Sequence, residues 1–408
     1  MDAIAYLAPY GLDWLNLLVR WLHIITGIAW IGASFYFVWL DNSLRAPAPG
    51  SELSNKGVAG ELWAVHGGGF YNPQKYLVAP AQLPKELHWF KWEAYSTWLS
   101  GVALLTIVYY LNAQAMMVDP SVANLTSWQA IGIGIGSLVL AWVVYDLLCR
   151  SKLGKHDLAF GVAMWALLSA SAYVLTHLLS GRAAYIQVGA MIGTIMVANV
   201  AMVIIPGQRK MVDAMIAGQK PDPVYGLRGK QRSVHNNYFT LPVLFIMISN
   251  HYAMTYRNEH AWAVLAVIMA AGVLIRHFFN LKHKGRIEWR YPIAGSALLL
   301  ALAVAIAPPR PAVLAAGADP AAQFAQVQAI VNQRCVSCHA THPTQQGFPT
   351  APAGVVLDSA QGISQNAERI YQQAVQLKAM PLGNLTQMSD AERAQVGAWF
   401  EGGAKTGK

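Results

Sequence analysis

Residues 184–205 read AYIQVGAMIGTIMVANVAMVII and contain no charged side chain. A bilayer core about 30 Å thick requires roughly 20 apolar residues per helix, so this stretch is long enough to cross a membrane. Seven further stretches meet the requirement within a few residues, at about 14–40, 93–111, 127–148, 158–178, 236–256, 261–280 and 291–307. The sequence therefore predicts an all-α fold, a membrane helix bundle with about eight transmembrane helices.

The composition of the whole chain agrees with a protein embedded in a lipid bilayer. Of its 408 residues, 55% are hydrophobic and only 12% are charged, whereas an average soluble domain carries about 25% charged residues. The first apolar stretch is too long for a cleavable signal peptide, and no Lys or Arg precedes Arg20. We therefore expect this stretch to remain in the mature protein.

The net charge of +9 does not indicate a nucleic-acid partner, because the basic residues follow the connections between spans. Four alternate connections, 41–92, 149–157, 206–235 and 281–290, hold eighteen Lys and Arg residues, and the other connections hold two. Basic connections face the cytoplasm. We therefore expect the N-terminus and, after eight crossings, the C-terminus on the periplasmic side of a bacterial inner membrane.

Residues 335–339, near the C-terminus, read CVSCH. In the C-x-x-C-H motif two thiols attach a c-type haem and the histidine binds its iron from one side. Cys335, Cys338 and His339 are thus the predicted haem c residues. Covalent attachment takes place on the outer face of the bacterial inner membrane, which agrees with the orientation that the charges predict. The remaining cysteine, Cys149, is expected to be an ordinary interior thiol.

The change in composition after the last span predicts a second domain. Residues 1–307 form the expected membrane domain, and residues 321–408 have ordinary soluble composition and are expected to form a small cytochrome c domain. Residues 308–320, PPRPAVLAAGADP, are rich in Pro, Ala and Gly and are expected to link the two.

Met380 is the predicted sixth ligand of the haem c iron. Pro381 follows it and stiffens the loop that must hold a weak thioether on iron. His/Met ligation raises the potential of c-type haems, which suits an electron acceptor. Met388 is the rival ligand, and a site with His342 or with no sixth ligand is the other alternative.

Histidines within the spans suggest a second, b-type haem. Ionisable side chains at membrane depth are costly and often functional, and two imidazoles on facing helices can ligate iron. Electrons that cross the hydrocarbon layer need such an intermediate carrier, because tunnelling falls exponentially with distance. We expect His23 and His251 to hold this haem, with His177 as a substitute. For each histidine, a hydrogen-bonded role in the core is the alternative.

The long connection 41–92 combines residue types that suit a planar anion. Three glycines follow His66 and permit close backbone approach. Aromatic faces stack on planar rings, and Lys side chains attract anions. The site residues predicted here are His66, His88, Lys75, Lys91 and Tyr71, with Phe70 and Trp89 as additional stacking faces. An aromatic belt at the lipid headgroups is the alternative for residues 88–95.

The span 236–256 also has unusual polarity. Pro242 lies inside it and is expected to kink the helix, and helix-breaking residues within membranes tend to line cavities. Hydrogen-bonding side chains in or beside this span are Asn236, Asn237, Thr240, Ser249 and Asn250.

The stretches GELWAVHGGGFY, LHWFKWEAYSTWLSG and HNNYFTLPVLFIMISNHY, with CVSCHATHPT and MPLGN in the tail, resemble the membrane-bound urate hydroxylase family, also described as cytochrome c urate oxidases. This resemblance runs over nearly the whole chain. It implies oxidation of urate to 5-hydroxyisourate in purine breakdown, with electrons delivered to the fused haem c instead of dioxygen. An external cytochrome or terminal oxidase would then re-oxidise the haem.

The resemblance supplies no set of catalytic residues, so roles in the connection 41–92 rest on physical arguments. Lys75 and Lys91 would hold the urate anion. Water adds to the oxidised ring, and His66 or His88 would serve as general base, since an imidazole titrates near the working pH.

Two other functions fit parts of the same pattern. A membrane cytochrome that relays electrons from quinol or a partner would also contain CVSCH and buried histidines, but the connection of about 50 residues favours an enzyme, since long loops are often functional. A transporter would show broken helices in two related halves. One proline-bearing span and no internal repeat argue against that reading.

Overall fold

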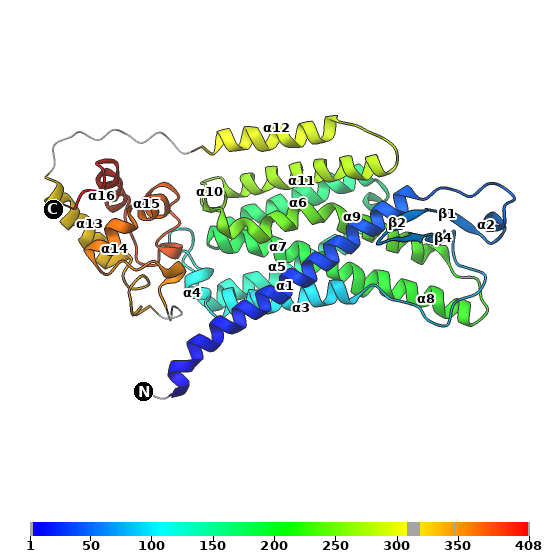
Figure 1. The fold of residues 1–408 in the computed structure, drawn as a ribbon, viewed down its shortest axis with the longest axis horizontal. Helices are drawn as coiled ribbons and strands as arrows, with labels where there is room; N and C mark the ends of the chain where they lie inside the picture. Colours follow the sequence, from blue (N-terminus) through cyan, green and yellow to red (C-terminus); the bar gives the residue numbers. More distant parts are fainter. Residues whose placement is uncertain (1–2, 308–318, 346–347, 349, 407–408) are drawn as a thin grey trace.

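The computed structural model describes residues 3–307, 319–345, 348 and 350–406, with side chains from residue 10 onward. Most of this chain is helical, and long helices pack side by side into one bundle (Figure 1). The predicted linker, residues 308–320, lies almost wholly outside the described residues.

The bundle is built from long helices, some of which continue through π-helical segments. Its helices are α1 (Ala3–Ser43), α3 (Trp92–Leu104) continued by η1 (Leu105–Tyr110), α5 (Ser127–Arg150), α6 (Asp157–Thr176), α7 (Gly181–Ala198) continued by η3 (Asn199–Ile204) and α8 (Ile205–Ile216), α9 (Pro223–Ile248), α11 (Ala261–His283) and α12 (Arg290–Ala305). Short α4 (Ala113–Met116) and α10 (Ala253–Tyr256) lie in the connections at one end of the bundle (Figure 1).

Five helical stretches in the described residues are long and apolar enough to cross a membrane. They are Tyr10–Ser43, Ser127–Arg150, Asp157–Thr176, Gly181–Ile216 and Ala261–His283. By length and composition, these helices are compatible with a membrane protein. The other predicted spans are helical too: 93–111 falls on α3 and η1, 236–256 falls mostly on α9, and 291–307 falls mostly on α12.

The core of the bundle surrounds α7, whose Ala184, Val188, Ile192 and Ile195 are fully buried. Gly189 allows α9 to approach, because a Cβ there would lie 2.5 Å from a side-chain carbon of Ile246. In contrast, α1 and α12 lie at the edge and expose large apolar side chains, including Trp21, Ile28, Leu300 and Val304. Such continuous apolar faces are unfavourable in water and suit contact with lipid.

The connection 41–92 contains short strands, so the fold is not purely α-helical. It comprises α2 (Glu52–Asn55), β1 (Val58–Glu61), β2 (Ala64–His66), β3 (Gly69–Tyr71) and β4 (Gln74–Tyr76). Strand β1 pairs with β4 and β2 pairs with β3, both antiparallel. Gly67 and Gly68 form the two-residue turn between β2 and β3 at φ +57° and +80°, a conformation that only glycine adopts readily. We refer to these two strand pairs as the ribbons.

The C-terminal unit lies at the end of the bundle opposite the ribbons (Figure 1). Its helices are α13 (Pro320–Arg334), α14 (Ala360–Gln365), α15 (Ala367–Ile370) continued by η6 (Tyr371–Gln376), and α16 (Asp390–Glu401). It has a hydrophobic core of its own, in which Val327, Ile363, Val396 and Trp399 are almost fully buried. A box of reciprocal hydrogen bonds between Ser389 and Glu392 caps α16.

Candidate functional site

The CVSCH motif directly follows α13 and is ordered by backbone hydrogen bonds. The N–H of Cys335 donates to the carbonyl of Val331 at 2.8 Å, and the N–H of His339 donates to that of Cys335 at 2.9 Å. Neither motif cysteine forms a disulfide. Burial raises the pKa of the Cys335 thiol to about 12 and also raises that of Cys338. Both are therefore neutral thiols at physiological pH.

The imidazole of His339 has the arrangement of a metal ligand. Its Nδ1 lies 2.9 Å from the carbonyl oxygen of Val355. Because a carbonyl only accepts, Nδ1 carries the hydrogen and Nε2 keeps its lone pair. A second hydrogen bond of this kind orients metal-ligating histidines and raises their basicity. The donor set of Cys335, Cys338 and His339 therefore fits a covalently attached haem.

The two methionines proposed as sixth ligand have different surroundings. Met380 is half-buried, and its loop is fixed through its backbone: its N–H donates to Gln373 at 2.9 Å and its carbonyl accepts from Arg393 at 2.8 Å. Met388 is buried in the core of the C-terminal unit. His342 is exposed. Met380 as sixth ligand stays a prediction.

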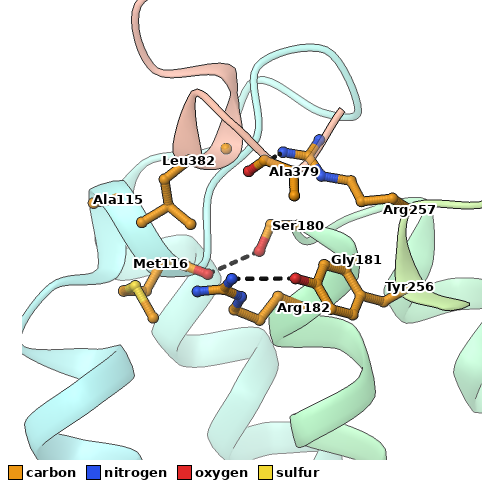
Figure 2. Close-up of a pocket in the computed structure, with 10 residues that line it drawn as sticks. Ala115, Met116, Ser180, Gly181, Arg182, Tyr256, Arg257, Ala379 and Leu382 are labelled. Carbon is orange, nitrogen blue, oxygen red and sulfur yellow. Dashed lines mark hydrogen bonds between the residues drawn. The ribbon is translucent and has the colours of Figure 1, made fainter. Parts of the chain in front are cut away.

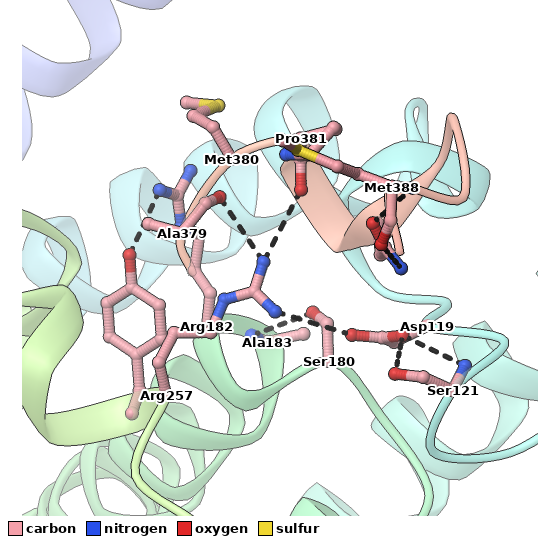
Figure 3. Close-up of polar contacts among 12 residues, drawn as sticks. Asp119, Ser121, Ser180, Arg182, Ala183, Arg257, Ala379, Met380, Pro381 and Met388 are labelled. Atoms are coloured by element: carbon pink, nitrogen blue, oxygen red, sulfur yellow. Dashed lines mark hydrogen bonds and ion pairs between the residues drawn. The ribbon is translucent and has the colours of Figure 1, made fainter. Parts of the chain in front are cut away.

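The loop that carries Met380 is joined to the bundle by Arg257, from the connection before α11. The Arg257 guanidinium donates to the carbonyl oxygens of Ala379 at 3.2 Å and Pro381 at 3.4 Å, as Figure 3 shows. Asp119, itself buried, lies 3.8 Å from the other side of that guanidinium. Arg257 is thus the residue through which the bundle holds the predicted ligand loop.

Close packing completes this junction. Gly383 has φ +59°, and a Cβ there would lie 3.1 Å from the carbonyl oxygen of Val118. Beside it lies a cavity of about 10 Å³ between the ends of α4, α7 and α10 and the loop of Leu382 (Figure 2), which is room for about one water molecule. Arg182 at its wall donates to the hydroxyl of Tyr256 at 3.1 Å.

The residues predicted in the connection 41–92 lie on different elements of that connection. His66 and Tyr71 are exposed on the ribbon formed by β2 and β3. Lys75 forms an ion pair with Asp41 near the end of α1, a carboxylate that also pairs with Lys230 at 2.9 Å. No hydrogen bond or ion pair joins any two of the five predicted residues, all of which lie in the described part of the chain.

His88 and Lys91 lie outside the ribbons, near the start of α3. The ring of His88 packs edge-on against Phe90 at 4.6 Å, and Phe90 packs against Phe37 of α1 at 4.7 Å. Lys91 lies 5.9 Å from the ring centre of Trp92. Two of the three glycines after His66 form the turn between β2 and β3, and Gly69 begins β3 opposite His66, so they give no independent support for a ligand at His66. The assignments of all five residues stay predictions.

The histidines predicted to bind a second haem differ in their fit. His23 of α1 is half-buried against α3, with Nδ1 3.1 Å from the carbonyl oxygen of Thr97 and 3.0 Å from the hydroxyl of Ser100. His251 is exposed on the short 3₁₀ segment η4 (Ser249–His251). The substitute, His177, is exposed at the end of α6 and bonded to the carbonyl of Tyr173 at 2.7 Å. His23 and His177 each have a ring nitrogen bonded to a backbone carbonyl, but of the three histidines only His23 is half-buried, and the pair stays a prediction.

A layer of buried polar side chains crosses the bundle in the half nearer the ribbons. Arg232 of α9 is 4% exposed and bonds Asp146 of α5 at 2.7 Å and Asn199 of η3 at 3.2 Å. Asn199 in turn donates to the hydroxyl of Tyr145 at 2.9 Å, and that hydroxyl lies 2.9 Å from Nδ1 of His235. This layer is the most extensive polar network in the described bundle.

Sequence reasoning identified part of this layer but missed a second buried arginine, Arg276, which bonds Asn237 of α9 at 2.8 Å. The asparagines of α9 stood out as polar groups at membrane depth. Arg276 is the first charged residue of α11, after fifteen uncharged ones, but its closeness to the end of the predicted span made it resemble an ordinary basic residue of the connection. It is instead 5% exposed.

The comparisons with known proteins give one match. The sequence model of the family described as "Urate oxidase N-terminal" matches residues 9–307, which cover the whole helical bundle. Comparisons with curated proteins and with solved structures returned no match. A family model that covers this much of the chain establishes membership, and the chain therefore belongs to the urate oxidase N-terminal family.

Proposed function

We propose that this protein oxidises urate to 5-hydroxyisourate and passes the electrons to a c-type haem in its C-terminal unit instead of to dioxygen. Membership of the urate oxidase N-terminal family supports urate as the substrate and an oxidoreductase activity. The observation that carries the electron-transfer part is the 2.9 Å contact between Nδ1 of His339 and the carbonyl oxygen of Val355, which leaves Nε2 available to bind iron. In the sequence, His339 directly follows Cys338, and the thiols of Cys335 and Cys338 are both free.

The overall reaction sets what the protein must provide. Urate takes up one water and releases two electrons and two protons. A haem c bound at Cys335, Cys338 and His339 would supply a one-electron acceptor, so the electrons leave in two transfers or through a second carrier. The protons and the water require a base, for which His66 and His88 are the proposed residues.

The proposed topology places urate oxidation and the haem on opposite sides of the bacterial inner membrane. The ribbons and the C-terminal unit lie at opposite ends of the bundle (Figure 1). The basic residues of the connections cluster at the ribbon end, which favours eight crossings with this end in the cytoplasm. An external cytochrome or terminal oxidase would then take electrons in the periplasm.

The proposal also explains why the Met380 loop is held to the bundle. An electron must pass between two units of one chain, and its transfer rate falls steeply with distance. The bonds from Arg257 to Ala379 and Pro381 fix one orientation of the C-terminal unit against the bundle. A unit that hung freely from its linker would sample many longer distances.

The decisive experiment mixes purified, oxidised holoprotein with urate under strictly anaerobic conditions and follows the haem absorption. We expect reduction of the haem and formation of 5-hydroxyisourate, with two haems reduced per urate consumed. Quinol is the matched comparison. Reduction by quinol but not by urate would refute the proposal and favour the alternative of an electron-relay cytochrome with no substrate chemistry.

A further inference from the structure

Three buried side chains of α9 and α11 form a cluster that the described contacts leave incomplete. Asn237 is fully buried, Arg276 is 5% exposed and Asn280 is 6% exposed. The side-chain oxygen of Asn237 accepts from Nε of Arg276 at 2.8 Å and from Nδ2 of Asn280 at 3.0 Å. This one oxygen therefore orients both neighbours.

The outer atoms of the same side chains have no hydrogen-bond partner in the described structure. These atoms are Nη2 of Arg276, Nδ2 of Asn237 and Oδ1 of Asn280, and Nδ1 of the neighbouring His283 shares this property. Leaving a buried donor or acceptor unsatisfied costs about 1–3 kcal/mol each, and more for a charged group. Four such atoms, where the middle of α9 meets the last turns of α11, point to a ligand that satisfies them.

The charge of Arg276 strengthens this interpretation. Arg232 is buried to a similar degree, but it bonds the carboxylate of Asp146 at 2.7 Å. Among the ion pairs of the described residues, none includes Arg276. A buried cation without a counter-charge is strongly unfavourable, so the group that completes this cluster is expected to carry a negative charge.

An aromatic ring lies against the cluster. The guanidinium carbon of Arg276 lies 4.0 Å from the ring centre of Phe35 of α1, which is a close cation–π contact. Phe35 thus places an aromatic ring beside the unsatisfied polar atoms and holds the guanidinium of Arg276 in position.

We propose that Arg276, Asn237 and Asn280 bind the urate anion, an inference that rests on the proposed function. Urate is flat and carries adjacent N–H and C=O groups on its rings. Nη2 of Arg276 and Nδ2 of Asn237 are donors for its negatively charged edge, and Oδ1 of Asn280 is an acceptor for a ring N–H. This assignment gives recognition of the anion to side chains of α9 and α11 instead of to Lys75 and Lys91.

The surroundings of the cluster favour entry of an anion from the ribbon end. Asn280 lies one turn before the end of α11 at His283, and the connection that follows carries Lys284, Arg286 and Arg290, the last two of which share the carboxylate of Glu288. Positive charges beside an entrance raise the local concentration of anions. The unsatisfied cluster is thus close to one of the basic connections of the bundle.

The test uses Asn280→Asp in the full-length, haem-loaded protein. This substitution keeps the size of the side chain and places a carboxylate beside Arg276. The carboxylate neutralises the guanidinium from within the protein and repels a bound anion. We expect urate binding, measured by equilibrium dialysis on the dithionite-reduced protein, to weaken by about 10- to 100-fold. Thermal stability should be equal or higher. A purely structural role of Asn280 instead predicts lower thermal stability without loss of urate binding.

Two further variants keep the test falsifiable. Arg276→Gln should weaken urate binding to a similar extent, and Arg369→Gln, on the exposed surface of the C-terminal unit, is the matched control that should bind as the wild type does. Inorganic phosphate, which is tetrahedral, should not displace urate at equal concentration. Equal displacement would overturn the assignment to a planar anion.

The outcomes separate the site from the function. If urate reduces the wild-type haem and both cluster variants show unchanged urate affinity and half-saturation, the site is wrong and the proposed function stands. If the wild type binds urate, the variants do not, and urate leaves the haem oxidised, then the site stands and the proposed function is wrong.

Discussion

Arg257 of the bundle donates to the backbone carbonyl of Ala379, 3.2 Å away in the C-terminal unit. The same guanidinium reaches Pro381, so its two contacts flank Met380 (Figure 3). The predicted haem loop is thus fixed by the very connection that precedes α11, the helix of Arg276.

Arg257→Gln should slow electron transfer into the C-terminal unit without changing the haem itself. Losing charge-assisted hydrogen bonds at a partly buried contact costs about 1.5–3 kcal/mol of docking. We expect urate-driven haem reduction, followed by stopped-flow absorption, to slow several-fold, with an unchanged spectrum and unchanged reduction by dithionite. Arg369→Gln, on the exposed surface of the C-terminal unit, is the control. An unaffected rate in Arg257→Gln would show that docking does not limit transfer.

Replacing both Cys335 and Cys338 by Ser should abolish covalent haem attachment and leave the bundle folded. The core of the C-terminal unit is separate from the core around α7, so loss of the haem is not expected to unfold the helices. Haem staining after denaturing electrophoresis measures attachment, and circular dichroism measures helix content. Retention of stained haem in the double variant would show that Cys335 and Cys338 do not attach the haem.

Asp146→Ala should destabilise the bundle strongly, because it leaves the guanidinium of Arg232 buried and uncompensated. Breaking one partner of a buried ion pair typically costs about 3–5 kcal/mol. Thermal unfolding in detergent measures the loss. Replacing both partners together with apolar residues of similar size should restore much of the stability, and a double variant as unstable as the single one would contradict this account.

His66→Ala tests the proposed base on the ribbons. A general base contributes about 10²- to 10⁴-fold to the rate, so urate-driven haem reduction should fall by about that factor while urate affinity and the haem spectrum stay normal. The ribbon turn depends on Gly67 and Gly68, and both remain in this variant. Normal turnover would show that His66 is not the general base.

The C-terminal unit should lose stability at acid pH through Asp358 and Glu392. A hydrogen bond from the Thr341 N–H lowers the pKa of Asp358, and one from the Ser389 N–H lowers that of Glu392. A carboxyl whose folded pKa lies below its unfolded value stabilises the fold above the unfolded pKa, near 4. That contribution disappears as the pH falls through the folded pKa.

Unfolding of the unit should therefore begin below about pH 4, and near-ultraviolet circular dichroism can follow it. In Asp358→Asn the unit should be less stable at neutral pH and less sensitive to acid. Identical acid profiles for variant and wild type would exclude Asp358 from this effect.

The helices were predictable from the sequence because long apolar runs have few alternative structures. The stretch 184–205 falls on α7 and η3, and 127–148 lies within α5. The ribbons were not predicted, because their strands are three or four residues long. The glycines after His66 were interpreted as a place where a ligand approaches the backbone, but Gly67 and Gly68 form the turn between β2 and β3.

The hydrogen bond between Asn237 and Arg276 could not be predicted from the sequence either. The two residues are 39 positions apart, and only the packing of α9 against α11 brings them together. An arginine near the end of an apolar helix normally reaches the membrane surface, so its burial required the structure. In contrast, CVSCH could be proposed as a haem attachment motif directly from the sequence, since the chemistry of this motif depends on residues that are neighbours in the chain.

The short helix α12 constrains the lipid around the protein. Its 16 residues rise about 24 Å, less than the roughly 30 Å of an average hydrocarbon layer. Such a mismatch is relieved when the bilayer thins locally or when flanking side chains such as Trp289 and Arg290 extend toward the headgroups. Membranes with shorter acyl chains should therefore accommodate this edge of the bundle at lower elastic cost.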